Sequence, residues 1–230
     1  LVNWDPRLQT TVSDEEIELK EITENFYYLK YGPFTIGTAR PETKFGDKYV
    51  VMHPTDARYA KWRPGEKIEL EWINGPITAT VIKDESIDPA FGTGVMTITP
   101  WHDAVDWAIA ERHQLEKEPI IDLQGKLLPL AGEFAGMHIK KARPLIVETL
   151  RQKGLVKKID PNYRHAVPTN SRGGGVIEPQ ILEQWFVAVN KPLAGYGGKT
   201  LKELMREPVA NGGIRIIPER FEKICFQWID

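Results

Sequence analysis

Residues 67–82, KIELEWINGPITATVI, carry the clearest fold signal in this chain of 230 residues. Charged and apolar residues alternate from Lys67 to Trp72, which is the period of a strand with one buried face. Asn74-Gly75 follows, a pair that tolerates the positive φ angles of a tight hairpin turn. Ile77 to Ile82 then returns as the partner strand, so the stretch predicts a β-hairpin.

Further apolar runs on both sides of this hairpin extend the β pattern. Phe26 to Leu29 and Phe34 to Thr38 flank the turn Tyr31-Gly32-Pro33. Val95 to Thr99 is a short run that ends at Pro100. Because glycine and proline punctuate strands, each run is expected to form one.

Two helices are expected among these strands. One begins after Asp103 and ends near His113, and the other runs from Lys140 to Lys153, where Gly154 stands at a C-cap position. Short strands with helices packed around them indicate an α+β fold, mainly β, organised as a β-barrel with peripheral helices.

The character of the chain changes after Asp160. Asp160-Pro161-Asn162 and residues 171–175 are expected to be loops, and short helices are expected at Lys199 to Glu207 and Pro218 to Trp228. These features place a domain boundary near residues 158–163.

Composition and charge narrow the class of protein. Hydrophobic residues make up 41% of the chain and charged residues 27%, which is ordinary for a soluble globular domain. The formal net charge of −2 argues against a protein that coats nucleic acid through bulk charge. The apolar runs fall short of the ~20 residues of a membrane span. The start of the chain has neither a signal peptide nor a methionine, so we expect a cytoplasmic fragment of a longer protein.

Residues 38–43, TARPET, end one predicted strand with side chains suited to a binding site. Arg40 offers a fork of donors for phosphate or carboxylate oxygens, and Thr38 and Thr43 offer hydroxyl groups. The alternative is a polar turn in which Pro41 sets the bend.

Residues 91–99, FGTGVMTIT, form a second candidate segment that begins at Phe91. The glycines around Thr93 let backbone approach a ligand closely, and the following strand places Thr97 and Thr99 on one face.

Two carboxylates follow this strand. Asp103 and Asp106 share one face of a helical turn, where they could hold an ammonium group and a hydroxyl group. The alternative is a capping arrangement, with Asp103 as the N-cap and Asp106 at the third helical position. His102 has no second histidine or cysteine at zinc spacing, so a structural or polar-contact role is expected for it. With Cys225 as the only cysteine, no metal site is predicted.

Together these segments resemble the connective insertion, or editing domain, of bacterial-type valyl-tRNA synthetases over almost the whole chain. The first part of the match consists of Arg40-Pro41-Glu42-Thr43, Gly46-Asp47 and His53-Pro54. The second part consists of Phe91-Gly92-Thr93-Gly94, Thr99-Pro100, His102-Asp103 and Asp106. Shorter matches near the ends are Val2-Asn3-Trp4-Asp5-Pro6, Ser13-Asp14-Glu15, Glu178-Pro179, Gln184-Trp185-Phe186-Val187 and Trp228.

The resemblance implies three segments. Residues 1–20 would lead out of the synthetic core, residues 21–160 would form the β-barrel editing domain, and residues 161–230 would return to the core. The two ATP-binding signatures of this class do not occur in the chain, so it is not expected to activate valine. No cofactor is expected for editing, and ATP would serve only the full-length synthetase.

The implied activity is hydrolysis of threonine wrongly esterified to valine tRNA, with threonyl-adenylate as a second candidate substrate. An apolar synthetic pocket rejects threonine only weakly, whereas a pocket that requires the threonine hydroxyl can discriminate well. A positioned water would attack the ester. The implied partners are the acceptor end of valine tRNA, the mischarged threonyl group and the rest of the synthetase, with no membrane.

The resemblance also assigns roles to residues. The catalytic set is Asp103, Asp106 and Thr99, and the substrate-binding set is Thr38, Arg40, Thr43, Phe91, Thr97 and His102. Asp103 and Asp106 would hold the threonyl ammonium and γ-hydroxyl, in an order that stays open. Arg40 and Phe91 would help to hold the terminal adenosine.

Three positions depart from the family pattern. The family usually has a lysine where this chain has Thr97, often a threonine at Ala39, and commonly a cysteine at Asn170. The first two departures motivate one alternative, a tRNA-binding module whose hydrolytic site has decayed. The other alternative, the editing domain of an isoleucyl or leucyl synthetase, is disfavoured by Glu42-Thr43 and Gly46-Asp47.

Overall fold

The computed structural model describes residues 1–230, which fall into two units, Leu1–Leu182 and Glu183–Asp230. The strands of the first unit are β1 (Val2–Asp5), β2 (Thr10–Val12), β3 (Ile17–Tyr31), β4 (Phe34–Thr38), β5 (Tyr49–Met52), β6 (Lys67–Trp72), β7 (Gly75–Lys83), β8 (Val95–Thr97), β9 (Val156–Asn170) and β10 (Glu178–Gln180). Its helices are α1 (Ala104–His113) and α2 (Ile139–Gln152), with 3-10 turns that include η2 (Pro41–Gly46), η3 (Ala57–Tyr59) and η4 (Pro129–Phe134).

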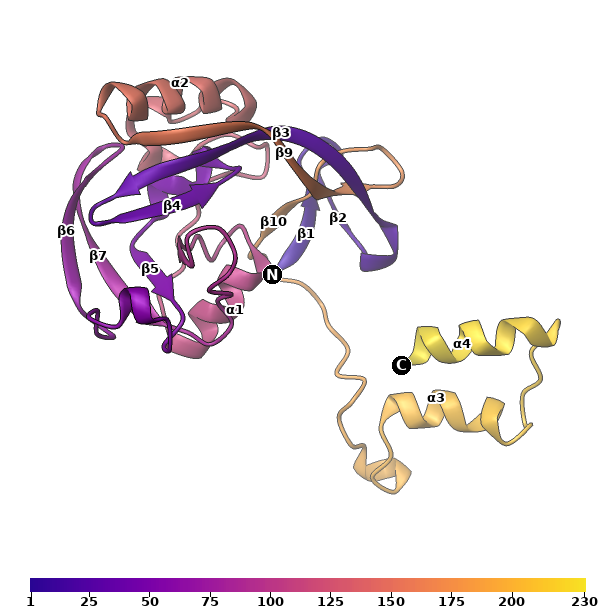
Figure 1. Ribbon diagram of the computed structural model, residues 1–230. Helices are drawn as coiled ribbons and strands as arrows, with labels where there is room; N and C mark the ends of the chain where they lie inside the picture. Colours follow the sequence, from indigo (N-terminus) through magenta and orange to yellow (C-terminus); the bar gives the residue numbers. More distant parts are fainter. The chain divides into compact units, whose positions relative to one another are not determined.

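The strands form three small sheets, with orders β10-β1-β2, β4-β3-β9 and β6-β7-β5-β8 (Figure 1). The mixed, mainly β class predicted from the sequence is therefore correct. The predicted closed barrel is not, because each sheet ends in two edge strands and none closes on itself. Alternation of polar and apolar residues indicates only that a strand has one buried face. Strands of closed barrels and strands of open sheets both have such a face, so the pattern does not distinguish them.

The predicted hairpin at residues 67–82 is confirmed as β6 and β7. The register pairs Lys67 with Thr80 and Trp72 with Gly75. The two-residue loop is therefore Ile73-Asn74, one position earlier than the Asn-Gly pair suggests. Gly75 keeps a positive φ of 115° as it enters β7.

Strands β3 and β9, each 15 residues long, form the longest antiparallel pair in the unit. The loop predicted at Asp160-Pro161-Asn162 is wrong, because β9 runs through it. The register shifts there: Phe26 pairs with Asp160 and Glu24 with Tyr163, so Pro161 and Asn162 lie opposite a single residue. A β-bulge of this kind accepts a proline, which has no N–H to donate to the ladder.

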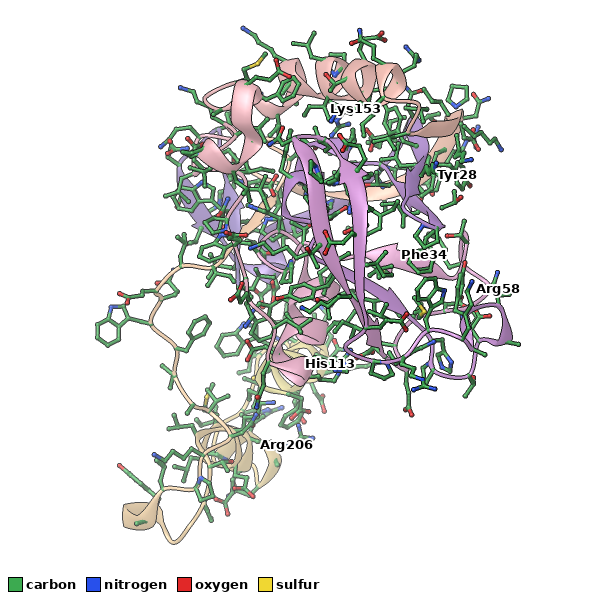
Figure 2. All side chains as sticks on the ribbon, turned by 90° about the vertical axis from the view of Figure 1, so that its left-hand side faces the viewer. Tyr28, Phe34, Arg58, His113, Lys153 and Arg206 are labelled. Carbon is green, nitrogen blue, oxygen red and sulfur yellow. The ribbon has the colours of Figure 1, made fainter.

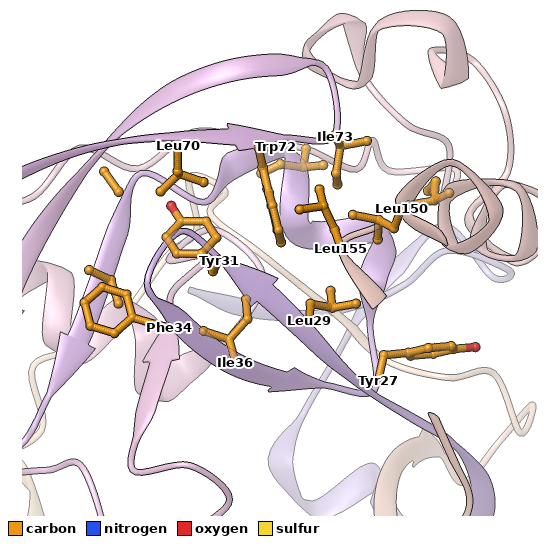
Figure 3. Close-up of a cluster of buried hydrophobic side chains, with 14 of the residues drawn as sticks. Tyr27, Leu29, Tyr31, Phe34, Ile36, Leu70, Trp72, Ile73, Leu150 and Leu155 are labelled. Atoms are coloured by element: carbon orange, nitrogen blue, oxygen red, sulfur yellow. The ribbon is translucent and has the colours of Figure 1, made fainter. Parts of the chain in front are cut away.

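The helices predicted after Asp103 and at residues 140–153 are confirmed as α1 and α2. Helix α2 covers the sheet of β3, β4 and β9 on the side seen at the top of Figure 1. This helix, this sheet and the sheet of β5, β6 and β7 share a cluster of buried apolar side chains that includes Leu29, Ile36, Trp72 and Leu150 (Figure 3).

Two aromatic residues of this core hold the segment that follows β4. The hydroxyl of Tyr31 donates to the backbone oxygen of Asp47 at 2.8 Å, and the indole N–H of Trp72 donates to the backbone oxygen of Lys44 at 2.7 Å. Their rings meet edge to face, with centroids 4.8 Å apart. The core therefore fixes the backbone of η2 and of the residues just after it.

The second unit contains helices α3 (Leu201–Ala210) and α4 (Glu222–Ile229), which confirm the two short helices predicted there. Arg206 of α3 forms an ion pair with Asp230 at 2.5 Å. Several large apolar side chains of this unit are exposed, among them Trp185, Phe186 and Trp228. No helix of the chain has both the length and the apolar character of a membrane span.

The contacts divide the chain after Leu182, and β9 continues without a break through residue 160. The boundaries at residues 20 and 160 that the resemblance implies stay predictions.

Candidate active site

A pocket of about 330 Å³ opens where η2, β8 and the start of α1 meet. Its lining consists of Gly37, Thr38, Arg40, Thr43, Lys44, Met96, Thr97, Thr99, His102, Asp103, Val105 and Asp106. Both candidate segments of the sequence therefore contribute to one cavity. All predicted site residues lie on it except Phe91, which lies in a neighbouring hollow.

The threonines of the first segment hold the turn that begins η2. The backbone N–H of Arg40 donates to the Thr38 hydroxyl at 2.9 Å, and the Thr43 hydroxyl donates to the backbone oxygen of Arg40 at 3.0 Å. These bonds are the ones expected of a polar turn. Because the same residues line the pocket, the turn and the wall of the pocket are one structure.

Arg40 lies at the edge of the pocket within a network of carboxylates. Its guanidinium pairs with Glu178 at 2.6 Å and with Glu42 at 3.5 Å. Burial alone would lower the pKa of Arg40, but the charges of Glu178 and Glu42 outweigh it and raise the pKa. Glu42 is itself fully buried and receives two hydrogen bonds from Arg143 of α2, at 2.7 and 2.9 Å.

The two aspartates of the second segment have different environments. Asp103 is exposed and is the N-cap of α1, because its Oδ1 accepts the backbone N–H groups of Val105 at 2.8 Å and Asp106 at 3.0 Å. Asp106 is buried, and its Oδ2 accepts the backbone N–H of Thr99 at 2.7 Å. Burial, reinforced by the charge of Asp103, raises the pKa of Asp106 to about 7.

The floor of the pocket carries a charge that the sequence did not reveal. Lys44 is 6% exposed, and its ammonium lies 3.3 Å from Oδ1 of Asp47 and 3.0 Å from the Thr97 hydroxyl. Burial raises the pKa of Asp47 to about 6, although the charge of Lys44 opposes the shift. The signal for Lys44 was its spacing of three residues from Asp47 on a turn, which also fits an exposed pair.

His102 is held by the protein through both ring nitrogens. Nε2 accepts the backbone N–H groups of Ile120 at 3.0 Å and Ile121 at 3.1 Å. Nδ1 must therefore carry the proton, and it lies 3.1 Å from Glu178 and 3.2 Å from the backbone oxygen of Pro179. The structure places His102 in the wall of the pocket, with no nitrogen available for a substrate or a metal.

A second, mainly apolar hollow of about 510 Å³ adjoins the pocket and shares Gly37, Thr38, Met96 and Val105 with it. Phe26, Tyr163 and Phe91 give it aromatic walls, and the first two rings lie with centroids 4.5 Å apart. The sequence indicated only Phe91, because Phe26 and Tyr163 come together through the β3–β9 pairing.

The loop that carries Phe91 is anchored at its base. Arg58, labelled in Figure 2, donates to the backbone oxygen of Pro89 at 2.6 Å while it pairs with Asp56. The hydroxyl of Tyr59 donates to the backbone oxygen of Thr93 at 2.7 Å. Phe91, at the tip, has 62% of its surface exposed.

The chain contains no group of three or more acidic, histidine or cysteine side chains that could hold a metal ion. Asn170 is buried and donates to Oδ2 of Asp5 at 2.9 Å.

Comparison with known proteins places this geometry in context. The family model of class I tRNA synthetases (I, L, M and V) matches residues 1–230. The chain is 40% identical to the valine–tRNA ligase of Pseudothermotoga lettingae, 38% to that of Thermotoga maritima and 37% to that of Staphylococcus carnosus. Each alignment covers 100% of this chain and 26% of the relative, so the chain spans about a quarter of the length of these proteins.

Proposed function

Because the chain belongs to the class I tRNA synthetases (I, L, M and V), we propose that its pocket is an editing site that hydrolyses threonine esterified to valine tRNA. The observation that carries the proposal is that a buried carboxyl group, Asp106, and a buried ammonium, Lys44, line one small cavity. A dipolar amino-acid ester, with its cationic nitrogen and its oxygens, is complementary to such a pair. The valine–tRNA ligases among its relatives support valine tRNA as the partner.

The proposed binding mode uses both cavities. The threonyl group enters the polar pocket, where its α-ammonium meets Asp106, and the terminal adenosine of the tRNA lies in the apolar hollow. Phe26, Phe91 and Tyr163 offer faces on which a base can stack, a contact worth ~1–3 kcal/mol per base. Arg40 stays with its carboxylate partners and fixes the edge of the pocket.

Water is the proposed nucleophile. The pocket contains no cysteine or serine, and the hydroxyls of Thr38 and Thr43 are bonded within their turn. Hydrolysis then depends on a water that is positioned against the ester carbonyl by the bound substrate and the pocket wall. No metal and no cofactor takes part in this scheme.

The test is deacylation by this chain of valine tRNA charged with threonine, compared with the same tRNA charged with valine. We expect rapid release of threonine and slow release of valine. Release of neither, with the tRNA still bound, would favour a binding module without a hydrolytic site. Faster release from mischarged isoleucine tRNA than from mischarged valine tRNA would favour an isoleucyl editing domain.

A further inference from the structure

The ammonium of Lys44 lies in the floor of the pocket, and the protein supplies acceptors for two of its three hydrogen-bond donors. An ammonium group has three N–H donors. Two acceptors face it within hydrogen-bond reach, the Thr97 hydroxyl at 3.0 Å and Oδ1 of Asp47 at 3.3 Å. Because Lys44 also lines the cavity, one donor remains for an acceptor that enters the pocket.

The core holds the backbone of Lys44 and also that of its partner Asp47. Its backbone oxygen accepts the indole N–H of Trp72, and the backbone oxygen of its partner Asp47 accepts the hydroxyl of Tyr31. A buried charge that is held this rigidly is costly to keep and acts as a preorganised donor.

The floor and the rim of the pocket differ in burial. Lys44, Thr97 and Thr99 are at most 6% exposed, whereas Asp103 and Val105 are exposed at the rim. A group that reaches the floor is therefore out of water, and an unpaired donor there is not satisfied by solvent.

The charge of Lys44 dictates which substrate atom can lie beside it. An ammonium only donates hydrogen bonds, so the substrate atom must be an acceptor oxygen, and a second ammonium is repelled. The α-ammonium of an aminoacyl ester is therefore directed to Asp106, and a side-chain oxygen to the floor.

We propose that Lys44 is a specificity-determining residue of the editing site, whose ammonium donates a hydrogen bond to the γ-hydroxyl oxygen of the threonyl group. This inference rests on the proposed function. Valine presents a methyl group at the same place, which leaves the buried donor unpaired. The loss corresponds to about 10- to 100-fold in binding.

The two sides of the floor have complementary roles. Lys44, from η2, supplies the positive charge, and Thr97, from β8, accepts a hydrogen bond from it through its hydroxyl. A lysine at position 97 would therefore bring a charge to the same place from β8.

The experiment uses the whole chain and two non-hydrolysable probes, adenosine joined through an amide to threonine or to valine. We expect the unchanged chain to bind the threonyl probe about 10- to 100-fold more tightly than the valyl probe. Lys44→Met removes the charge at similar volume and should abolish most of this preference by weakening the threonyl probe alone. Lys44→Met combined with Thr97→Lys returns a charge from β8 and should restore the preference.

Three outcomes would overturn the inference. They are an unchanged preference in Lys44→Met, equal weakening of both probes, and a double variant that folds but discriminates no better than the single one. Should Lys44→Met fail to fold, the double variant decides alone. Deacylation of threonine by the unchanged chain is measured in parallel, because its absence would refute the proposed function, whereas its presence with an unchanged preference in Lys44→Met would refute only the role of Lys44.

Discussion

At the scale of single residues, the pocket holds the carboxyl group of Asp106 away from the water that would otherwise stabilise its charge. Asp106 receives one backbone hydrogen bond, from Thr99, against a burial that raises its pKa to about 7. In the unfolded chain the same group titrates near 3.9. Between these values the folded state holds a proton that the unfolded state has lost, so Asp106 makes folding less favourable as the pH rises from about 4 to about 7.

Asp106→Asn should therefore separate stability from activity. The amide can still accept the N–H of Thr99 but carries no charge, so we expect the unfolding free energy of the variant to exceed that of the unchanged chain by an amount that grows from near zero at pH 4 to ~4 kcal/mol above pH 7. Threonine deacylation should fall several hundred-fold or more, because an unpaired substrate ammonium costs ~3–5 kcal/mol. Urea unfolding at several pH values and deacylation rates measure the two effects.

Asp103→Asn is the matched control, because asparagine caps a helix about as well as aspartate. Because the charge of Asp103 adds to the rise in the pKa of Asp106, this variant should weaken the pH dependence of stability but not abolish it, since burial, the larger cause, remains. A variant at Asp106 that loses ~1 kcal/mol at every pH and keeps normal turnover would return that residue to a purely helical role.

The buried pair of Glu42 and Arg143 is the second feature at this scale. Glu42 is fully buried and has two short hydrogen bonds from Arg143, so removing this arginine leaves the carboxylate with only the more distant guanidinium of Arg40, at 3.5 Å. Arg143→Met should cost ~3–5 kcal/mol of unfolding free energy.

The double variant Glu42→Gln with Arg143→Met should recover a large part of that loss, because neither charge of this pair then remains buried. Chemical denaturation of the two single variants and the double variant gives the coupling energy. Additive losses would show that the pair does not hold η2 against α2.

At the scale of elements, the loop between β7 and β8 carries the wall of the apolar hollow. Gly94, at its end, has a φ of +70°, and a side-chain carbon there would lie 2.1 Å from Nη2 of Arg58 and 2.9 Å from the backbone oxygen of Pro89. Gly92 has a φ of +57°, but nothing lies within 4 Å of the corresponding position.

Gly94→Ala should therefore displace the loop, whereas Gly92→Ala should not. The left-handed backbone costs both variants ~1 kcal/mol, and only Gly94→Ala adds the steric clash. We expect Gly94→Ala to raise the KM for mischarged tRNA several-fold, with a smaller change in kcat. Equal kinetics of the two variants would show that the loop position does not contribute to the hollow.

Some of these elements could be predicted from the sequence and others could not. Local patterns predicted the β6–β7 hairpin, α1 and α2, because turn residues and helix caps act on their immediate neighbours. The path of β9 through Pro161 could not be predicted, since the bulge that accepts the proline depends on the register with β3. The barrel was wrong for a similar reason: closure is a property of the edges and not of one strand.

The spacing of residues in the sequence predicted most of the pocket lining but could not show which role each residue has. Asp103 and Asp106 stand three residues apart, which predicts one face of a helix and leaves the burial of each undetermined. Lys44 was missed because nothing local distinguishes a buried lysine from an exposed one. Its burial follows from Tyr31 and Trp72, which come from β3 and β6.

At the scale of the whole molecule, one series of polar contacts between arginine, glutamate and histidine side chains joins distant parts of residues 1–182. In order, it runs His165–Glu24 (2.7 Å), Glu24–Arg143 (2.7 Å), Arg143–Glu42 (2.7 Å), Glu42–Arg40 (3.5 Å), Arg40–Glu178 (2.6 Å) and Glu178–His102 (3.1 Å). Strand β10 supplies Glu178, which holds both Arg40 and His102 at the pocket. The short sheet of β1, β2 and β10 is therefore part of what shapes the site.

This series leads to a prediction about where the chain can be shortened. A chain that ends at Leu182 keeps β10 and every residue that lines the two cavities. A chain that ends at Asn170 keeps β9 but loses β10, and with it Glu178 and Gln180. Arg40 and His102 then lose their carboxylate, and the indole N–H of Trp101 loses its acceptor on Gln180 at 2.9 Å.

We expect residues 1–182 to unfold cooperatively and to deacylate threonine from valine tRNA within a few-fold of the whole chain. Residues 1–170 should lose ~3–5 kcal/mol, because buried charges are left without partners, and should lose most of the activity. Thermal unfolding and deacylation of both pieces test this. Equal behaviour of the two pieces would place the end of the functional unit before β10, near the boundary at residue 160, and would remove Glu178 from the structure that supports the site.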